Sequence, residues 1–400
     1  MPIPDLDYDF SETDRAVQET AHRFASEVLR PVGEALDKLP AEDVIAPGSA
    51  LWGVYKQYQE LGFDALDPDM PALDKARLQF IVLEELGWGD SGLAISLGVA
   101  AFPSEIAAMV GREDLMEKFP SGEIGCWAIT EPDHGSDMVD FGDALIDPRG
   151  KRQAPNIVAR ADGNEFVVSG QKSSWVSNGT SATAAALFCA VEMPDGTRGN
   201  GVFLARIEGE TISKGKALEK IGQRALNQGE IFFDGLRIPA DHMVAGPDDY
   251  AAFTDLTLCR ANGIMAATFS GAARAAFELA LDYAKTRVQG GVPIIEHQSV
   301  QTRIFNMYKK VIAARTLSYR AVLSNETSEQ PALAAAIAAK TVATQAAFDV
   351  ASEALQIFGG NGISREYPIE KIFRDTRIAM IEDGCNEMLG LIGAGRLACD

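Results

Sequence analysis

Apolar residues recur at helical spacing from Ser11 to about Lys118. The first of these stretches opens with Ser11, and a hydroxyl followed by acidic residues is typical of a helix N-cap. Residues 72–90 repeat the period and are expected to end at the glycines near their last position. Residues 92–110 are apolar on nearly every side, which predicts one buried helix. The pattern predicts a helical N-terminal domain over residues 1–122.

The pattern changes near Glu123. From there to about Val244, short runs of β-branched and aromatic residues alternate with Gly, Asn, Asp and Pro. One of the breaks, ADGNEF, has the Asp-Gly composition of a hairpin turn. The run that contains Trp175 and Ser177 is expected to be a strand. We therefore predict a small β domain over residues 123–244.

Helical spacing returns after the segment GPDDY and continues to the end of the chain. Three stretches, residues 260–288, 295–325 and 331–360, are each long enough to span a helical bundle. Their many Ala, Gly and Ser residues would allow close packing. The third predicted domain is a C-terminal helical bundle over residues 245–400. The fold class is thus mainly α with a central β domain.

The composition of the chain narrows the range of possible functions. Hydrophobic residues make up 46% of the chain, which is typical of a folded globular protein, and the formal net charge is -21. So acidic a chain would be repelled by nucleic acid. The five cysteines form no CxxC pair and the four histidines are dispersed, which argues against a zinc site or a disulfide framework. With no basic apolar leader and no apolar run of about 20 residues, we expect a cytoplasmic protein without an integral membrane segment.

Five blocks, in order, resemble signatures of the flavin-dependent acyl-CoA dehydrogenase family. Residues 127–137 (WAITEPDHGSD) are similar to T-E-P-x-x-G-S-D, and residues 170–179 (GQKSSWVSNG) to G-x-K-x-[WY]-[IV]-[TS]-N. Residues 222–239 match the strand and loop that follow. Residues 287–301 resemble R-x-Q-F-G-x-P-I-x-x-x-Q, and residues 356–375 resemble Q-x-x-G-G-x-G followed by P-x-E-[KR]-x-x-R-D. The resemblance implies that family's fold of helical N-domain, β-barrel-like middle domain and C-terminal bundle.

The resemblance also implies FAD as the cofactor. By matching position, Thr130 would bind the pyrimidine edge of the flavin and Ser136 its phosphate. Trp175 would lie against the ring and Ser177 would hydrogen-bond near N5. Taken without the surrounding block, Trp175 could equally be a core residue, because a tryptophan in a strand is more often buried than functional.

A further set of matching residues implies an oligomer, a tetramer or a dimer, in which each FAD is shared between subunits. In the family, the glycine loop meets the ADP half of the FAD of a neighbouring subunit, and an arginine reaches the same pyrophosphate. The residues that match are Gln356, Gly359 and Gly360 in the loop, and Arg287 and Gln289 in the arginine segment. The phenylalanine of the family's R-x-Q-F-G motif is Gly290 here, so an aromatic contact to the flavin is missing.

The segment MIEDGCNEM carries the candidate base. The family's base is usually a Glu directly before a Gly, and here that position is Asp383, whereas Glu382 falls where the family often has Tyr. An Asp is one methylene shorter, so its carboxylate is withdrawn by roughly 1.5 Å. The family's alternative position for the base is Cys259, which has no carboxylate. Next to it, Arg260 is a candidate for ordering the active site or contacting CoA.

The resemblance implies α,β-dehydrogenation of an acyl-CoA with Asp383 as base, in fatty acid or carboxylic acid catabolism. An electron-transferring flavoprotein would be the electron acceptor. Three alternatives stay open. Nitroalkane oxidases of the same superfamily use an aspartate in a D-G-x-N context, and Gly384 and Asn386 match it. The chain could instead be an inactive, acyl-CoA-binding subunit of a hetero-oligomer, or EDGCNE could be a polar turn without a base.

Overall fold

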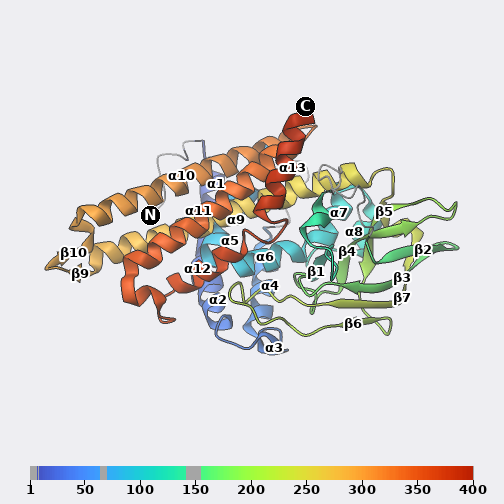
Figure 1. Ribbon diagram of the computed structural model, residues 1–400, viewed down its shortest axis with the longest axis horizontal. Helices are drawn as coiled ribbons and strands as arrows, with labels where there is room; N and C mark the ends of the chain where they lie inside the picture. Colours follow the sequence, from blue (N-terminus) through green and yellow to red (C-terminus); the bar gives the residue numbers. More distant parts are fainter. Residues whose placement is uncertain (1–6, 8, 64–69, 141–154, 400) are drawn as a thin grey trace.

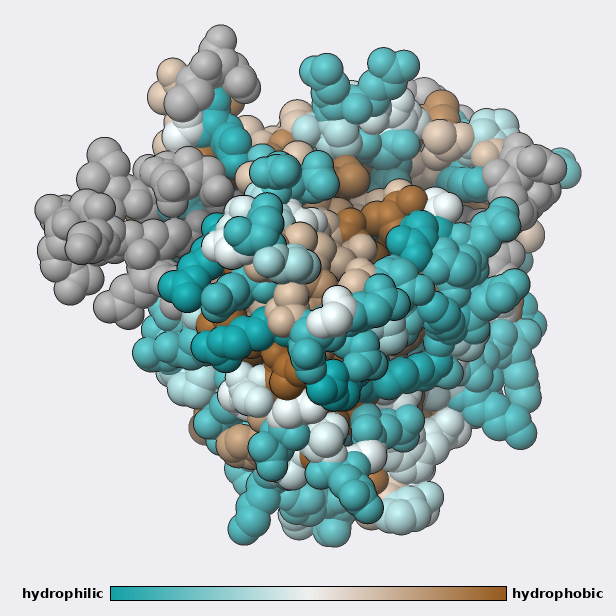
Figure 2. Space-filling model, turned by 90° about the vertical axis from the view of Figure 1, so that its right-hand side faces the viewer, coloured by the Kyte–Doolittle hydropathy of each residue, from teal (hydrophilic) through white to brown (hydrophobic). Residues whose placement is uncertain are grey.

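The computed structural model describes residues 7, 9–63, 70–140 and 155–399. The molecule is elongated, with the ends of the long helices on one side and a β-sheet on the other (Figure 1). Figure 2 shows the sheet end, where the surface is largely hydrophilic and apolar residues gather in a recess near its centre. Residues 1–6, on which part of the expectation about a leader segment rests, lie outside the described residues.

Short helices precede the first strand, as predicted. The predicted N-cap is confirmed, because Ser11 Oγ accepts a hydrogen bond from the Asp14 backbone N–H and the Asp14 carboxylate accepts one from the Ser11 N–H. The helices are α1 (Glu12–Phe24), α2 (Arg30–Leu36), α3 (Ala41–Val44), α4 (Ala50–Leu61), α5 (Ala72–Gly89), α6 (Ser91–Ala100), α7 (Phe102–Met109) and α8 (Glu113–Lys118), with a π-helical turn at Ala25–Leu29.

One prediction in this region is wrong. The single buried helix expected over residues 92–110 is two helices, α6 and α7, which meet at an angle of 48° around Ala101. The break follows from Pro103 in the first turn of α7. A proline has no N–H for the preceding turn and its ring clashes with the carbonyl four residues before it, so the helix cannot run on straight.

The middle of the chain forms a mixed sheet. Its order is β6-β7-β3-β2-β4-β5-β8, with β1 and β2 both parallel to β4 and the other pairings antiparallel. The predicted hairpin turn is confirmed between β2 and β3, where Asp162 pairs with Glu165 and Gly163 has a φ of 64°. The strands are β1 (Gly125–Ala128), β2 (Val158–Asp162), β3 (Glu165–Lys172), β4 (Ala184–Glu192), β5 (Arg198–Arg206), β6 (Ile212–Lys214), β7 (Ile231–Pro239) and β8 (Met243–Ala245).

Strand β4 joins two hydrophobic cores. Alternate side chains of a strand point to opposite faces of the sheet. Ala185, Leu187 and Cys189 pack into a core within the sheet domain. Ala186 and Phe188 pack on the other face, against α7, α9, α11 and α13. The sheet is therefore covered by helices on one face, which fixes it relative to the bundle.

Helices dominate again after Ala245. Close packing by small residues is confirmed between α5 and α9, because a Cβ added at Gly271 would lie 1.8 Å from the Glu84 carbonyl oxygen. A short hairpin, β9 (Val288–Gln289) with β10 (Val292–Pro293), joins the first two long helices. The helices are α9 (Tyr250–Thr286), α10 (Gln298–Thr327), α11 (Leu333–Phe358), α12 (Ile369–Ile378) and α13 (Asn386–Cys399).

Among the described residues, two helical segments are long and apolar enough to cross a membrane, Tyr250–Thr286 and Leu333–Ile363, and the bent pair α6–α7 would make a third. This corrects the expectation that no segment reaches the necessary length. The apolar windows of the first two segments are 78% and 56% buried inside the protein. Their alanine-rich character thus gives them a packing role in the bundle core, where small side chains allow helices to approach closely.

Candidate active site

The loop between α12 and α13 carries Asp383 in a left-handed backbone conformation, with a φ of 53°. Such a conformation is uncommon for a residue other than glycine and persists only where its surroundings enforce it. Gly384 follows with a φ of 85°, and a Cβ there would lie 3.0 Å from Leu389 and 3.2 Å from Val139. A glycine after Asp383 is therefore required by both the backbone and the packing.

The side chain of Lys340, on α11, fixes this loop. Its ammonium group donates to the carbonyl oxygens of Glu382 at 3.0 Å and Gly384 at 2.8 Å, and to Asn386 Oδ1 at 2.9 Å. These bonds use all three donors of the ammonium group. The loop is also joined to the middle domain, because the Cys385 N–H donates to Ser136 Oγ at 3.0 Å.

The electrostatics of the loop favour a carboxylate that can accept a proton. Burial raises the pKa of Asp383 to about 6, and the nearby Lys340 limits that rise. Burial and the neighbouring Asp383 charge raise the pKa of Glu382 to about 7. Burial lowers the pKa of Lys340 to about 8, opposed by the two carboxylates. Asp383 is thus mostly ionised at neutral pH, and its basicity exceeds that of an exposed aspartate.

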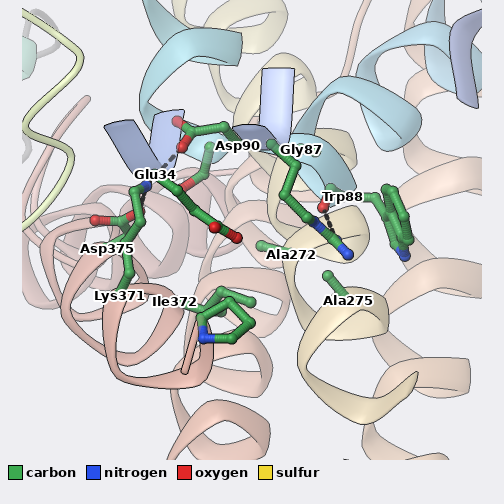
Figure 3. Close-up of a pocket in the computed structure, with 13 residues that line it drawn as sticks. Glu34, Gly87, Trp88, Asp90, Ala272, Ala275, Lys371, Ile372 and Asp375 are labelled. Atoms are coloured by element: carbon green, nitrogen blue, oxygen red, sulfur yellow. Dashed lines mark hydrogen bonds and ion pairs between the residues drawn. The ribbon is translucent and has the colours of Figure 1, made fainter. Parts of the chain in front are cut away.

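Glu382 is held by a different set of contacts. Its Oε1 accepts a hydrogen bond of 2.6 Å from Gln223 Nε2, and the backbone N–H of Gln223 donates to Asp375. Asp375 in turn shares Lys371 with Asp90 beside a cavity of only about 20 Å³ (Figure 3). Such a cavity has room for about one water molecule, so this charged cluster ties α12 to the N-terminal helices.

The hydroxyls of the two middle-domain signatures lie next to one another. Thr130 Oγ1 and Ser173 Oγ are 2.7 Å apart, and Ser177 Oγ accepts a hydrogen bond of 3.2 Å from Gln228 Nε2. Trp175 lies in a turn and not in a strand, because β3 ends at Lys172, and this corrects the prediction for that run. The side chain of Trp175 is 61% exposed, so the alternative interpretation as a core residue is also wrong.

The second set of candidate residues lies at the far end of the bundle. The β9–β10 hairpin, with Arg287 and Gln289, is at the opposite end of the long axis from the sheet (Figure 1). The loop with Gly359 and Gly360 adjoins it, because Asn361 donates to the hydroxyl of Tyr283 near the end of α9. All five candidate residues of this set are exposed, namely Arg287, Gln289, Gln356, Gly359 and Gly360. One chain does not bring this set to Trp175.

Arg260 lines a separate cavity of about 690 Å³ between the N-terminal helices and the bundle. Its guanidinium pairs with Glu105 at 3.1 Å and Glu326 at 3.8 Å, and these carboxylates raise its pKa above the usual value. The residues that line this cavity do not include Asp383. Cys259, in its wall, belongs to the same hydrophobic cluster as Leu389, which contacts Gly384. Arg260 therefore lies at the cavity, whereas Asp383 does not line it.

Comparison with known proteins identifies the family. The family profile described as "Acyl-CoA dehydrogenase, middle domain" matches residues 126–236, and that described as "Acyl-CoA dehydrogenase, C-terminal domain" matches residues 252–398. The mitochondrial short-chain specific acyl-CoA dehydrogenase of Bos taurus is 30% identical over 400 residues, which cover 96% of this chain and 90% of that protein. The chain belongs to the acyl-CoA dehydrogenase family.

Solved structures agree with this assignment. Butyryl-CoA dehydrogenase from Megasphaera elsdenii superposes with a TM-score of 0.85 at 26% identity, over 98% of this chain and 100% of that one. A glutaryl-CoA dehydrogenase from Mycobacterium smegmatis in complex with FADH2 has a TM-score of 0.82 at 22% identity, over 99% and 97% of the two chains. The predicted fold of the acyl-CoA dehydrogenase family is confirmed.

Sequence reasoning missed the residues that hold the candidate site in place. Lys340, Gln223, Gln228 and Lys220 were not singled out, although Lys220 Nζ donates to Gln228 Oε1 at 2.9 Å and so orients the amide that contacts Ser177. One signal was available for Lys340. It is a lone charge within the alanine-rich stretch LAAAIAAKTVATQAAF of this acyl-CoA dehydrogenase. A lysine is almost never fully buried unless its charge is satisfied by partners.

Proposed function

We propose that this protein is an FAD-dependent acyl-CoA dehydrogenase that forms a double bond between the α- and β-carbons of an acyl-CoA thioester, with Asp383 as the base. The observation that carries the proposal is the loop of Asp383. A carboxylate of raised pKa stands on an enforced left-handed backbone, and the loop is hydrogen-bonded to Ser136 of the middle-domain signature. The family membership supplies the reaction class.

The residues present fit an FAD. Trp175 offers a largely exposed indole, and its backbone is hydrogen-bonded to Ser173, which contacts Thr130, and to Gln228, which contacts Ser177. Because Gln228 donates to Ser177 Oγ, the hydroxyl proton of Ser177 is left for another acceptor. Ser136 Oγ accepts from Cys385 N–H and can likewise donate its proton to a phosphate oxygen. When bound, FAD supplies the acceptor for the hydride that leaves the β-carbon.

In this mechanism the protein's own groups hold the substrate and take up a proton. Asp383 accepts the proton from the α-carbon, while the hydride leaves the β-carbon and the carbon–carbon double bond forms. Lys340 keeps the Asp383 loop fixed during this step. A base whose pKa is near the working pH combines ionisation with a strong proton affinity.

We assign the acyl-CoA thioester to the large cavity. Its volume of about 690 Å³ is in the usual range for ligand pockets. Leu97, Gly98 and Met109 give it an apolar section, and its polar section combines Arg260 and Lys75 with the carboxylates of Glu105 and Glu326. Cys259 in the cavity wall shares a hydrophobic cluster with Leu389 of α13, which packs near Gly384 of the base loop.

An electron-transferring flavoprotein is the proposed electron acceptor. We expect turnover of acyl-CoA with a flavoprotein or dye acceptor to be fast and reoxidation by oxygen to be slow, because the chain needs an external carrier for the electrons. The test measures enoyl-CoA formation with a dye acceptor and hydrogen peroxide formation without one. Hydrogen peroxide formed at the full turnover rate would contradict the proposal.

A shared cofactor between subunits is the second part of the proposal. Arg287 is exposed at the far end of the bundle and makes no contact with Trp175 in its own chain, which supports a role toward the FAD of a neighbouring subunit in a tetramer or dimer. We expect Arg287→Ala to lose FAD on dialysis and to form smaller oligomers. Absorbance and light scattering after dialysis measure both. Arg303→Ala, which changes an exposed side chain on α10, is the matched control. An Arg287→Ala protein with full flavin occupancy and unchanged size would argue against shared binding.

The second candidate function is a nitroalkane oxidase. One observation favours it, namely the aspartate in a D-G-x-N context, in which Asn386 Oδ1 accepts from Lys340. A nitroalkane has an acidic α-proton that the same carboxylate could take, and such an enzyme needs no CoA. The cavity beside Arg260 argues for the thioester, because a small nitroalkane would leave most of it empty.

A further inference from the structure

Helix α11 places one charged group in the interior behind the Asp383 loop. Lys340 has no exposed surface, although an isolated ammonium group is among the costliest groups to bury. It is stabilised by acceptors alone at hydrogen-bond distance: two carbonyl oxygens and Asn386 Oδ1. Leucine or alanine would fill this position of an alanine-rich helix at far lower cost. The presence of a lysine at this position is therefore explained by its contacts with the loop and not by the packing of the helix.

The two carbonyls that Lys340 binds flank Asp383 on either side. They belong to Glu382 and Gly384, so the ammonium group fixes the peptide plane that enters Asp383 and the plane that leaves Gly384. A left-handed aspartate is strained and needs such external constraint. Asn386 extends the contact into the first turn of α13, where its Nδ2 also donates to Thr344 Oγ1 at 3.0 Å. One side chain thus connects α11 to both ends of the loop.

Several charged groups surround this contact. The groups that act on Asp383, Glu382 and Lys340 are Glu387 on α13, Cys385 in the loop, Lys220 from the middle domain and, through Lys220, Asp375 on α12. The charge of Lys220 lowers the pKa of Glu382, whereas the charge that lowers the pKa of Asp383 is that of Lys340. Lys340 is therefore the cation that governs the charge of Asp383.

We propose that Lys340 is a positioning residue for the base: its ammonium form holds the Asp383 loop in shape and stabilises the Asp383 carboxylate, and its deprotonation releases the loop. The proposal rests on the assignment of Asp383 as the base. It extends that assignment to a residue 43 positions earlier in the chain that touches neither substrate nor cofactor, and it makes the reaction sensitive to pH on both sides of neutrality.

The expected pH profile has two limbs. Flavin reduction by acyl-CoA falls on the acid side as Asp383 is protonated, with a midpoint near the pKa of about 6. It falls on the alkaline side as Lys340 loses its proton, with a midpoint near the pKa of about 8. A neutral amine offers only two N–H donors to three acceptors, so one carbonyl loses its partner. Both midpoints belong to the coupled pair and are apparent values.

Lys340→Met tests the proposal. Without the positive charge, the pKa of Asp383 rises, so the acid midpoint should move up by about one pH unit or more, and the alkaline limb should disappear. Lys340→Arg keeps the charge at all accessible pH values. Its acid midpoint should stay in place and its alkaline limb should move beyond the measured range.

Lys56→Met, on the exposed face of α4, is the matched control and should leave both limbs unchanged. An unchanged acid midpoint in Lys340→Met, or an unchanged alkaline limb in Lys340→Arg, overturns the proposal.

Hydrogen exchange of the peptide over residues 380–388 gives a second readout that needs no turnover. Exchange in Lys340→Met should be at least about tenfold faster than in the wild type and in Lys56→Met, because the loop loses its three hydrogen bonds. Exchange equal to that of the wild type overturns the proposal, even if Asp383 proves to be the base. If exchange is faster in Lys340→Met but the Asp383→Asn variant is fully active, the contact between Lys340 and the loop is supported and the assignment of Asp383 as the base is rejected.

Discussion

Asp383→Asn is expected to lower the rate of flavin reduction by acyl-CoA by at least about a hundredfold, because a general base contributes typically about a hundred to ten thousand. FAD and ligand binding should be retained. Lys340 donates to the carbonyl oxygens of Glu382 and Gly384, and Ser136 Oγ accepts from the Cys385 N–H. These contacts, which fix the loop, do not use the Asp383 side chain. Rapid anaerobic mixing with acyl-CoA measures the rate directly.

Glu382→Gln is the matched control for this substitution. It removes a neighbouring carboxylate of raised pKa but keeps an oxygen that can accept from Gln223 Nε2. We expect a far smaller loss of rate than in Asp383→Asn. If Glu382→Gln abolishes flavin reduction and Asp383→Asn does not, the base is the other carboxylate and the assignment by the following glycine is wrong.

Lys172→Met is expected to destabilise the fold by about 3–5 kcal/mol, because it leaves the fully buried carboxylate of Glu131 without its partner. The Lys172 ammonium group donates to Glu131 at 2.8 Å and to the carbonyls of Ile129 and Phe188 at 2.9 and 2.6 Å. Ile129 and Glu131 flank Thr130, so the same substitution should also weaken FAD binding. Chemical denaturation of the apoprotein measures the stability.

The double variant Lys172→Met/Glu131→Leu is the control for that effect. Replacing both members of a buried ion pair by apolar side chains often restores stability, since no unpaired charge is left inside. The double variant should therefore be more stable than Lys172→Met. A double variant that is less stable by the sum of the two single effects would show that the ion pair is not the source of the loss.

The order of helices and strands was predictable because it depends on local periodicity. The capping box at Ser11 and the hairpin turn at Gly163 each rest on residues within a few positions of one another. Two local errors have local causes as well. The break before α7 comes from Pro103, and the run that contains Trp175 leaves the strand because β3 already ends at Lys172.

The site was predictable only in part, because much of it rests on contacts that are distant in sequence. Asp383 could be chosen since the following glycine is adjacent to it. Lys340 reaches the loop from 42 and 44 residues away, and Gln223 reaches Glu382 across 159 residues. No spacing along the chain reveals such contacts. The same holds for the β9–β10 hairpin, whose place at the opposite end of the molecule from the sheet became visible only in the folded structure.

The central claim is that this protein uses FAD to remove two hydrogen atoms from an acyl-CoA thioester. Anaerobic mixing of the purified wild-type protein with a series of acyl-CoA thioesters, and in parallel with nitroalkanes, tests it most directly. We predict that at least one thioester bleaches the flavin absorbance, that enoyl-CoA forms in an amount equal to the flavin reduced, and that nitroalkanes leave the spectrum unchanged. Bleaching by a nitroalkane and by no thioester, or a purified protein without flavin, would contradict the claim.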